Sequence, residues 1–168
     1  VALHTRGRYR ADTVQCDLPA LFVFFTGETR DTLFAGESML PLTTHCDRSA
    51  PYEQYLLKEY WAYRIYEALA SESLRVRLVR MTYRDAAGRL DSFERYAFFT
   101  EHFESLARRH GVTVRPKGVF DPRTADPAQV ATFDLFQYAI GNTDWSAIKG
   151  HNVLLVESDG LVTPVPFD

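Results

Sequence analysis

Strict alternation of apolar and polar residues is the feature that most constrains the fold of this chain. It is clearest at residues 74–83, which begin Leu-Arg-Val-Arg-Leu, and a second apolar segment follows at residues 93–99 after an Asp-Ala-Ala-Gly turn signal at residues 85–88. A period of two places successive side chains on opposite faces of a strand. The two segments therefore predict an antiparallel hairpin.

Three shorter apolar segments near the start of the chain predict further strands. They lie at residues 3–9, 21–25 and 39–44, and Gly27-Glu28 and Ala35-Gly36 supply turn signals between the last two. Together with the hairpin at residues 74–99, these segments predict a small antiparallel sheet.

A long helical pattern separates the early strands from the hairpin. It covers residues 52–69, and Pro51 stands at a first-turn position ahead of it. The apolar and aromatic residues form two stripes, namely Leu56, Tyr60 and Tyr63, and Leu57, Trp61, Ile65 and Leu69. Two stripes predict a largely buried helix.

Glu59 lies between these two stripes, so its carboxylate is expected near the protein interior. A buried carboxylate needs a cationic or hydrogen-bonding partner. The alternative is an exposed glutamate paired along the helix, because Lys58 and Arg64 are close in sequence.

The C-terminal third predicts two helices and a second hairpin. A short helix is expected at residues 101–110, closed by Gly111, and residues 112–127 are expected to be irregular. The last helix begins at Asp126 as N-cap with Pro127 at its first position, and it ends at Gly141. Residues 153–156 and 161–165 then form a hairpin, whose Ser158-Asp159-Gly160 connection fits a type I′ turn.

Composition limits the number of domains and the classes of partner. A chain of 168 residues with 46% hydrophobic residues is long enough for one domain that buries roughly 70% of its unfolded surface. A net charge of -3 gives no electrostatic reason to expect nucleic acid as a partner, and no apolar run reaches the ~18 residues of a membrane span. Because the chain starts at Val1 and closes on Asp168 directly after an apolar segment, we expect it to be part of a longer protein.

Two cysteines, Cys16 and Cys46, leave the cellular compartment open. They can form one disulfide in an exported protein, or they can be two small buried thiols. A zinc site is not expected, because no further Cys pair or His pair lies near them.

Three oxygen-bearing side chains near the C-terminus indicate a candidate site for metal-assisted chemistry. Asp144 follows the last predicted helix, Asn152 precedes the first strand of the last hairpin, and Asp168 follows the second strand. Metal-assisted phosphoryl transfer needs a carboxylate to orient the attacking hydroxyl and hard oxygen ligands for Mg²⁺. The layout of these three residues therefore predicts metal-assisted phosphoryl transfer.

An arginine-rich segment near the N-terminus suggests phosphate binding. Arg6 and Arg8 flank Gly7, so the backbone can approach a phosphate while the arginines pair with its oxygens. The alternative is a solvated edge strand whose charges discourage aggregation.

The C-terminal motifs resemble a known family. Gly141-Asn142-Thr143-Asp144-Trp145-Ser146, His151-Asn152 and Pro164-Val165-Pro166-Phe167-Asp168 resemble the catalytic and metal-binding segments of the spore-coat protein H (CotH) group of atypical protein kinases and related bacterial proteins. The segment with Arg6 and the helix with Glu59 are similar, more loosely, to the family's phosphate-covering segment and ion-pairing helix.

The resemblance implies a set of roles. Asp144 would be the catalytic carboxylate, Asn152 and Asp168 the metal ligands, and Glu59 the ion-pair carboxylate. ATP and Mg²⁺ or Mn²⁺ would be the cofactors, and a protein or small-molecule hydroxyl would be the phosphate acceptor. The only lysines are Lys58, Lys117 and Lys149, so no strand before the Glu59 helix carries a phosphate-binding lysine, and Arg6 or Arg8 would take that role.

We therefore expect an α+β, protein-kinase-like fold in a single domain at residues 1–168. Residues 1–101 would form an N-terminal lobe with an antiparallel sheet and one long helix, and residues 102–168 would begin a helical lobe. Two other functions remain: a catalytically inactive kinase-like interaction module, and a hydrolase that uses Asp144 with His151, for which no Ser or Cys nucleophile motif is present.

Overall fold

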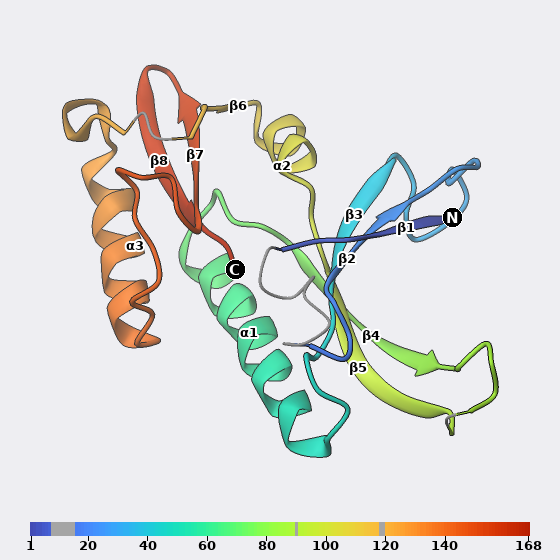
Figure 1. Cartoon of the computed structure of the whole chain (residues 1–168). Coiled ribbons are helices and arrows are strands. Elements are labelled where there is room, and N and C mark those ends of the chain that lie inside the picture. The colour runs from blue at the N-terminus through green and yellow to red at the C-terminus, as the bar shows by residue number, and fades with distance from the viewer. Residues whose placement is uncertain (8–15, 90, 118–119) are drawn as a thin grey trace. The chain divides into compact units, whose positions relative to one another are not determined.

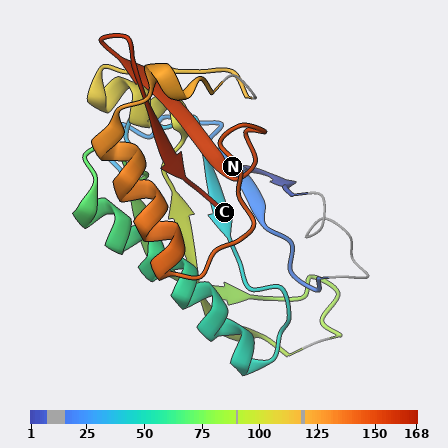
Figure 2. The same cartoon turned by 90° about the vertical axis from the view of Figure 1, so that its left-hand side faces the viewer.

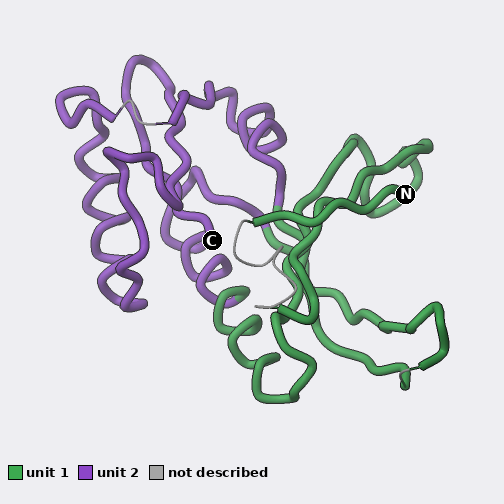
Figure 3. Tube along the Cα trace, viewed as in Figure 1, with its two compact units in different colours: residues 1–60, 76–100 green, residues 61–75, 101–168 purple. Residues whose placement is uncertain are grey.

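The computed structural model describes residues 1–7, 16–89, 91–117 and 120–168 (Figure 1). It is an α+β fold with two antiparallel sheets and three α-helices among these residues. The predicted α+β class is therefore confirmed. The chain forms two compact units, Val1–Tyr60 with Val76–Thr100 and Trp61–Arg75 with Glu101–Asp168 (Figure 3).

The first unit is built on a five-stranded antiparallel sheet of order β1-β2-β3-β5-β4. Its strands are β1 (Ala2–Thr5), β2 (Leu21–Phe24), β3 (Met39–Thr43), β4 (Val76–Tyr83) and β5 (Phe93–Thr100). The predicted β4–β5 hairpin is confirmed, with pairing from Val76↔Thr100 to Tyr83↔Phe93. The first strand is shorter than the predicted residues 3–9, of which residues 8 and 9 lie outside the described residues.

Alternation along β5 gives this sheet two different apolar faces. Ala97 and Phe99 belong to a cluster with Val23 and Leu42 on one face. Phe98 is fully buried, and its ring lies 6.0 Å from that of Tyr60 in helix α1 (Ala50–Leu69). The first half of α1 therefore packs on the sheet, as a half-buried antiparallel sheet requires.

The predicted burial of both stripes of α1 is wrong. Leu56 and Tyr66 are buried, but Trp61, Ile65 and Leu69 of the second stripe are exposed. The two stripes together cover more of the helix surface than its neighbours bury, because a helix beside a sheet buries chiefly the side that faces it. The division into units assigns the second half of α1 to the unit that contains residues 101–168.

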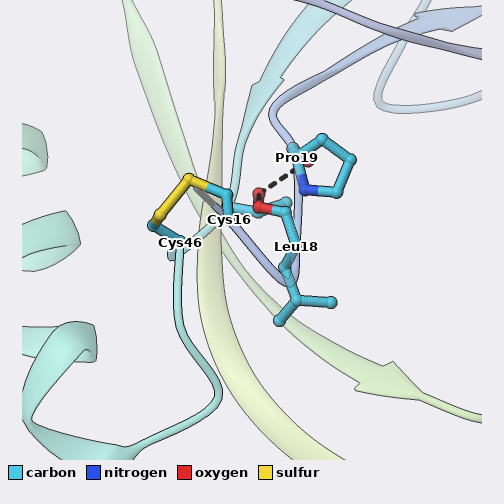
Figure 4. The surroundings of a disulfide bond; sticks show 5 residues. Cys16, Leu18, Pro19 and Cys46 are labelled. Carbon is cyan, nitrogen blue, oxygen red and sulfur yellow. Dashed lines mark hydrogen bonds between the residues drawn. A yellow bond between two sulfur atoms is a disulfide. The ribbon is translucent and has the colours of Figure 1, made fainter. Parts of the chain in front are cut away.

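A disulfide joins Cys16 to Cys46 in the first unit, with 4.6 Å between the Cα atoms (Figure 4). This separation lies within the usual range of about 4.4–6.8 Å. The Thr44 hydroxyl donates hydrogen bonds to the carbonyl oxygens of Leu18 and Pro19 at 3.1 and 2.9 Å, so the segment after Cys16 is held against the end of β3. Of the two alternatives for the cysteines, the structure has the disulfide.

The second unit contains a three-stranded sheet of order β6-β7-β8. Its elements are β6 (Thr113–Val114), β7 (Val153–Ser158), β8 (Leu161–Pro166), α2 (Phe103–His110), a 3₁₀ turn (Pro122–Thr124) and α3 (Pro127–Ala139). The segment predicted to be irregular, residues 112–127, thus contains a short strand and a helical turn. Strand β6 is only two residues long, too short to produce a recognisable alternation.

Local signals predicted the ends of the elements in this unit well. Asp126 Oδ1 accepts hydrogen bonds from the backbone N–H groups of Ala128 and Gln129, which confirms it as the N-cap of α3. In the β7–β8 turn, Asp159 and Gly160 have φ values of 52° and 80°, and a type I′ turn requires positive φ at both positions.

The β7–β8 hairpin is buried on both faces, as its continuous apolar run suggests. Val153, Leu155 and Val162 form a cluster with Phe133 of α3. Residues on the opposite face of the hairpin contribute to a second cluster with α1, α2 and α3. Its buried members are Tyr66, Ala70, Leu74, Leu106, Phe136, Leu154, Val156 and Val165. Figure 2 shows α3 beside the hairpin, so the loop after α3 begins at a helix that packs against β8.

Candidate functional site

The loop that follows α3 carries the predicted catalytic residue. Gly141 has a φ of 68°, a value that glycine adopts without a steric penalty, and the Asn142 N–H donates to the Gln137 carbonyl at 3.0 Å to close the helix end. The Asn142 carboxamide oxygen then accepts a hydrogen bond from the Asp144 N–H at 3.0 Å. The Gly-Asn-Thr-Asp sequence thus ends the helix and turns the chain so that Asp144 begins a loop.

A small antiparallel bridge closes this loop on itself. Ser146 and His151 exchange two backbone hydrogen bonds, each 2.9 Å, and the intervening turn includes Gly150. Trp145 fastens the loop to α3, because its ring packs edge-on against Phe133 at 4.8 Å. The bridge brings His151 and Asn152 back to Asp144.

Asp144 is the centre of the resulting cluster. His151 Nε2 lies 2.9 Å from Asp144 Oδ1, and Asn152 Nδ2 donates hydrogen bonds to the Asp144 carbonyl oxygen at 2.8 Å and to Oδ2 at 3.3 Å. The side chains of Asp144 and His151 are 80% and 55% exposed, so a solute can reach them. The structure therefore brings two of the predicted site residues, Asp144 and Asn152, into direct contact.

Asn152 and Asp168 stand at the same end of the β7–β8 hairpin. Val153 pairs with Pro166, and the Phe167 N–H donates to the Asn152 carbonyl at 3.2 Å. The Asp168 N–H donates to the Tyr63 hydroxyl at 2.9 Å, which attaches the end of the chain to α1. The two predicted metal ligands are thus neighbours through the hairpin, while a shared ion stays a prediction.

The described residues place limits on a metal site. Among them, no group of three or more His, Cys, Asp or Glu side chains is arranged to hold a metal ion. Mg²⁺, however, is usually bound through one or two protein oxygens together with substrate phosphates and water. Because the Asn152 Nδ2 donates to Asp144, its carboxamide oxygen is the atom left for a cation, and a Mg²⁺ site shared by Asn152 and Asp168 stays a prediction.

The predicted nucleotide-binding residues belong to the first unit. Arg6 directly follows β1, and its Nη2 donates a 2.7 Å hydrogen bond to the Thr43 hydroxyl at the end of β3. Arg6 Nε is buried and has no hydrogen-bond partner in the described part of the chain. Arg8 lies outside the described residues.

Glu59 is half-buried on α1. This intermediate burial matches neither a deeply buried carboxylate nor a fully exposed one. If Glu59 pairs with a cation, the candidates are Arg6, Arg8 and Arg77, and that pairing stays a prediction.

Sequence patterns alone did not single out the residues that hold Asp144 in position. The sequence gives His151 a chemical role only in a hydrolase, although it contacts the Asp144 carboxylate, and it assigns no role to Asn142 or Trp145. One local signal was present: Gly150, ahead of His151, allows the tight turn that returns the chain to Asp144.

No family model, curated protein or solved structure matches this chain. Within residues 1–7, 16–89, 91–117 and 120–168, no helix is both long and apolar enough to span a membrane.

Proposed function

We propose that this protein is an ATP- and Mg²⁺-dependent phosphotransferase that acts on a protein or small-molecule hydroxyl, with a protein-kinase-like fold. The observation that carries the proposal is the Asp144–Asn152 contact next to the β7–β8 hairpin, which Asp168 follows. Protein kinases use the same kinds of residue: an Asp that accepts the proton of the acceptor hydroxyl, followed by an Asn and a second Asp that hold Mg²⁺.

In this proposal Asp144 orients the acceptor hydroxyl and takes its proton. His151 and Asn152 contact the two carboxylate oxygens, so the carboxylate is held in one orientation. Positioning of this kind contributes to catalysis because a reacting group must be close and aligned. The exposure of Asp144 leaves room for an acceptor to approach it.

Asn152 and Asp168 would hold the Mg²⁺ ion through a carboxamide and a carboxylate oxygen. The bound ion would neutralise negative charge on the nucleotide phosphates. Three contacts fix the backbones of the two residues, namely the Phe167–Asn152 hydrogen bond, the Val153↔Pro166 pairing and the Tyr63 contact to Asp168. Two ligands held at one end of a hairpin suit a cation better than two ligands on independent loops.

The first unit supports the nucleotide-binding part of the proposal. Kinases carry a phosphate-binding Lys on the strand before the helix that bears the ion-pairing Glu. Here β3 precedes α1 with its Glu59, and β3 has the sequence Met-Leu-Pro-Leu-Thr without lysine. Arg6 reaches the end of this strand through Thr43, so it is the cation that we assign to the phosphates, with Arg8 beside it in sequence.

The test is nucleotide binding with and without Mg²⁺, combined with a phosphotransfer assay. Asp144→Asn should leave nucleotide affinity nearly unchanged and lower transfer by roughly 10²–10⁴-fold, the usual contribution of a general base. Asp168→Asn should weaken binding only in the presence of Mg²⁺, since it removes a charged ligand. Asp159→Asn, in the turn of the same hairpin, is the matched control, because Asn-Gly suits a type I′ turn as well as Asp-Gly does.

A binding-only interaction module gives the opposite results. Wild-type protein would then show no Mg²⁺-dependent nucleotide affinity, and Asp144→Asn and Asp168→Asn would behave like the Asp159→Asn control. That outcome would reject the phosphotransferase.

A further inference from the structure

A pocket in the first unit lies apart from the residues that we assign to phosphotransfer. Its volume is about 340 Å³, and the described residues that line it are Cys16, Thr44, His45, Cys46, Tyr52, Tyr55 and Leu56. The disulfide and the end of β3 form one side, and the first turns of α1 form another. Volumes of about 300–1,000 Å³ are typical of small-molecule sites, so this pocket suits a small ligand.

His45 is the unusual member of the lining. It is only 2% exposed, yet neither Nδ1 nor Nε2 has a hydrogen-bond partner in the described part of the chain. The rings of Tyr83 and Phe93 lie edge-on to the imidazole at 5.7 and 6.2 Å, and rings at this distance supply no acceptor of ordinary strength. Buried polar groups are nearly always paired, so an unpaired imidazole beside a pocket is evidence for a ligand.

The imidazole is neutral at physiological pH. Burial and, second, the nearby Arg95 lower the pKa of His45, whereas Glu53 and Asp47 oppose this shift. A neutral imidazole carries one N–H donor and one acceptor nitrogen. A ligand group that both donates and accepts therefore pairs with His45 in either tautomer, and a hydroxyl is the smallest such group.

The other residues that line the pocket favour an uncharged, aromatic ligand. None of the described lining residues is Asp, Glu, Lys or Arg, so no charged side chain there is ready to pair with an ionised ligand. Tyr52 and Tyr55 pack edge-to-face at 5.6 Å and are 40% and 62% exposed, while Leu56 is buried. Aromatic rings favour such edge-to-face contacts, and an added ring can continue the pair.

We propose that this pocket is a second binding site, for an uncharged phenol whose hydroxyl pairs with His45 and whose ring packs against Tyr52 and Leu56. The ligand is a free phenolic compound or a tyrosine side chain of another molecule, which share this chemistry. The site is independent of the proposed phosphotransfer, because it uses none of Arg6, Glu59, Asp144, Asn152 or Asp168.

The experiment is a titration of the protein with phenol and with toluene, which has the same ring without the hydroxyl. His45→Phe should weaken phenol binding about tenfold, the loss expected for one hydrogen bond, and should leave toluene binding unchanged. His4→Phe is the matched control, since His4 is an exposed histidine of the same unit, and it should bind phenol like the wild type. Equal phenol binding by His45→Phe and wild type would overturn the proposal.

A second measurement does not depend on the folding of a variant. In wild-type protein with ¹⁵N-labelled histidine, phenol should shift the ring-nitrogen signals of His45 and leave those of His4 in place, whereas unmoved His45 signals at saturating phenol would reject the site. Titration with N-acetyltyrosinamide then distinguishes the sources. If N-acetyltyrosinamide displaces phenol, the ligand is a tyrosine side chain. If the pocket does not bind N-acetyltyrosinamide, the ligand is a free phenol.

Discussion

His151 Nε2 lies 2.9 Å from Asp144 Oδ1, and this contact joins the two ends of the loop between α3 and β7. The backbone bridge between Ser146 and His151 sets the position of the histidine, so the ring is a support for the carboxylate. In the proposed phosphotransferase, His151 is therefore a positioning residue.

The first prediction concerns this support. His151→Ala should lower phosphotransfer by roughly ten- to a hundredfold, because a carboxylate that loses one of its contacts is less well aligned with the acceptor. The effect should be smaller than that of Asp144→Asn, and nucleotide affinity should stay constant. His151→Gln, which keeps a hydrogen-bond donor, should recover part of the rate in a single-turnover assay. Full activity of His151→Ala would show that the contact has no role in transfer.

The second prediction concerns Arg6. Arg6→Ala should reduce nucleotide affinity roughly ten- to a hundredfold, the range expected when a hydrogen bond between charged groups is lost. Arg6→Lys should keep more of the affinity, since a lysine serves this function in protein kinases. Arg80→Ala is the control, because Arg80 is an exposed arginine on β4 of the same sheet. If Arg6→Ala binds nucleotide as tightly as Arg80→Ala does, Arg6 does not hold the phosphates.

The third prediction concerns the disulfide. The two cysteines are 30 residues apart, and a loop of this length implies a stabilisation of about 3–4 kcal/mol from the reduced entropy of the unfolded chain. Urea unfolding of the Cys16→Ala/Cys46→Ala variant should show a loss of this size.

Mass spectrometry of non-reduced, alkylated protein checks whether the bond is present. Disulfides persist in oxidising compartments, so an intact bond favours an exported protein. Two freely alkylated thiols in protein kept under oxidising conditions would contradict the bond and remove the argument for export.

The fourth prediction is a pH dependence of stability caused by His45. Burial and Arg95 lower the pKa of His45 in the folded protein below its ordinary value of 6.5, against the opposing effect of Glu53 and Asp47. The unfolded chain therefore takes up a proton at a higher pH than the folded chain does. The contribution of His45 to the free energy of unfolding should be complete above pH 6.5 and should be lost as the pH falls toward the lowered pKa.

Urea unfolding between pH 8 and about pH 5 measures this effect. His110, whose pKa is also lowered, contributes a dependence of the same sign, so wild type must be compared with His45→Phe. The variant should show a weaker pH dependence than the wild type. If the free energy of unfolding depends on pH equally in the two proteins, His45 is not a source of the pH dependence.

Much of the local structure followed from the sequence by itself. The Asp126 cap with Pro127, the positive φ of Gly141 and the Asp159-Gly160 turn are set by single residues whose backbone preferences act within a few positions. Alternation predicted the β4–β5 pairing because a register shift of one residue would turn the apolar side chains to the other face of the sheet. The positions of Asp144, Asn152 and Asp168 relative to α3 and the last hairpin were predictable on this basis.

Only the tertiary structure decided which distant residues meet. The sequence contains no signal that Arg6 reaches Thr43, and it left open whether Cys16 and Cys46 form a disulfide. Gly150 permits a tight turn, but the sequence does not show that His151 then contacts Asp144. It also predicted a buried stripe on α1 where Trp61 and Ile65 are exposed. Periodicity shows which side chains share a face, whereas the packing of separate elements determines which faces are covered and which polar groups come within hydrogen-bonding distance.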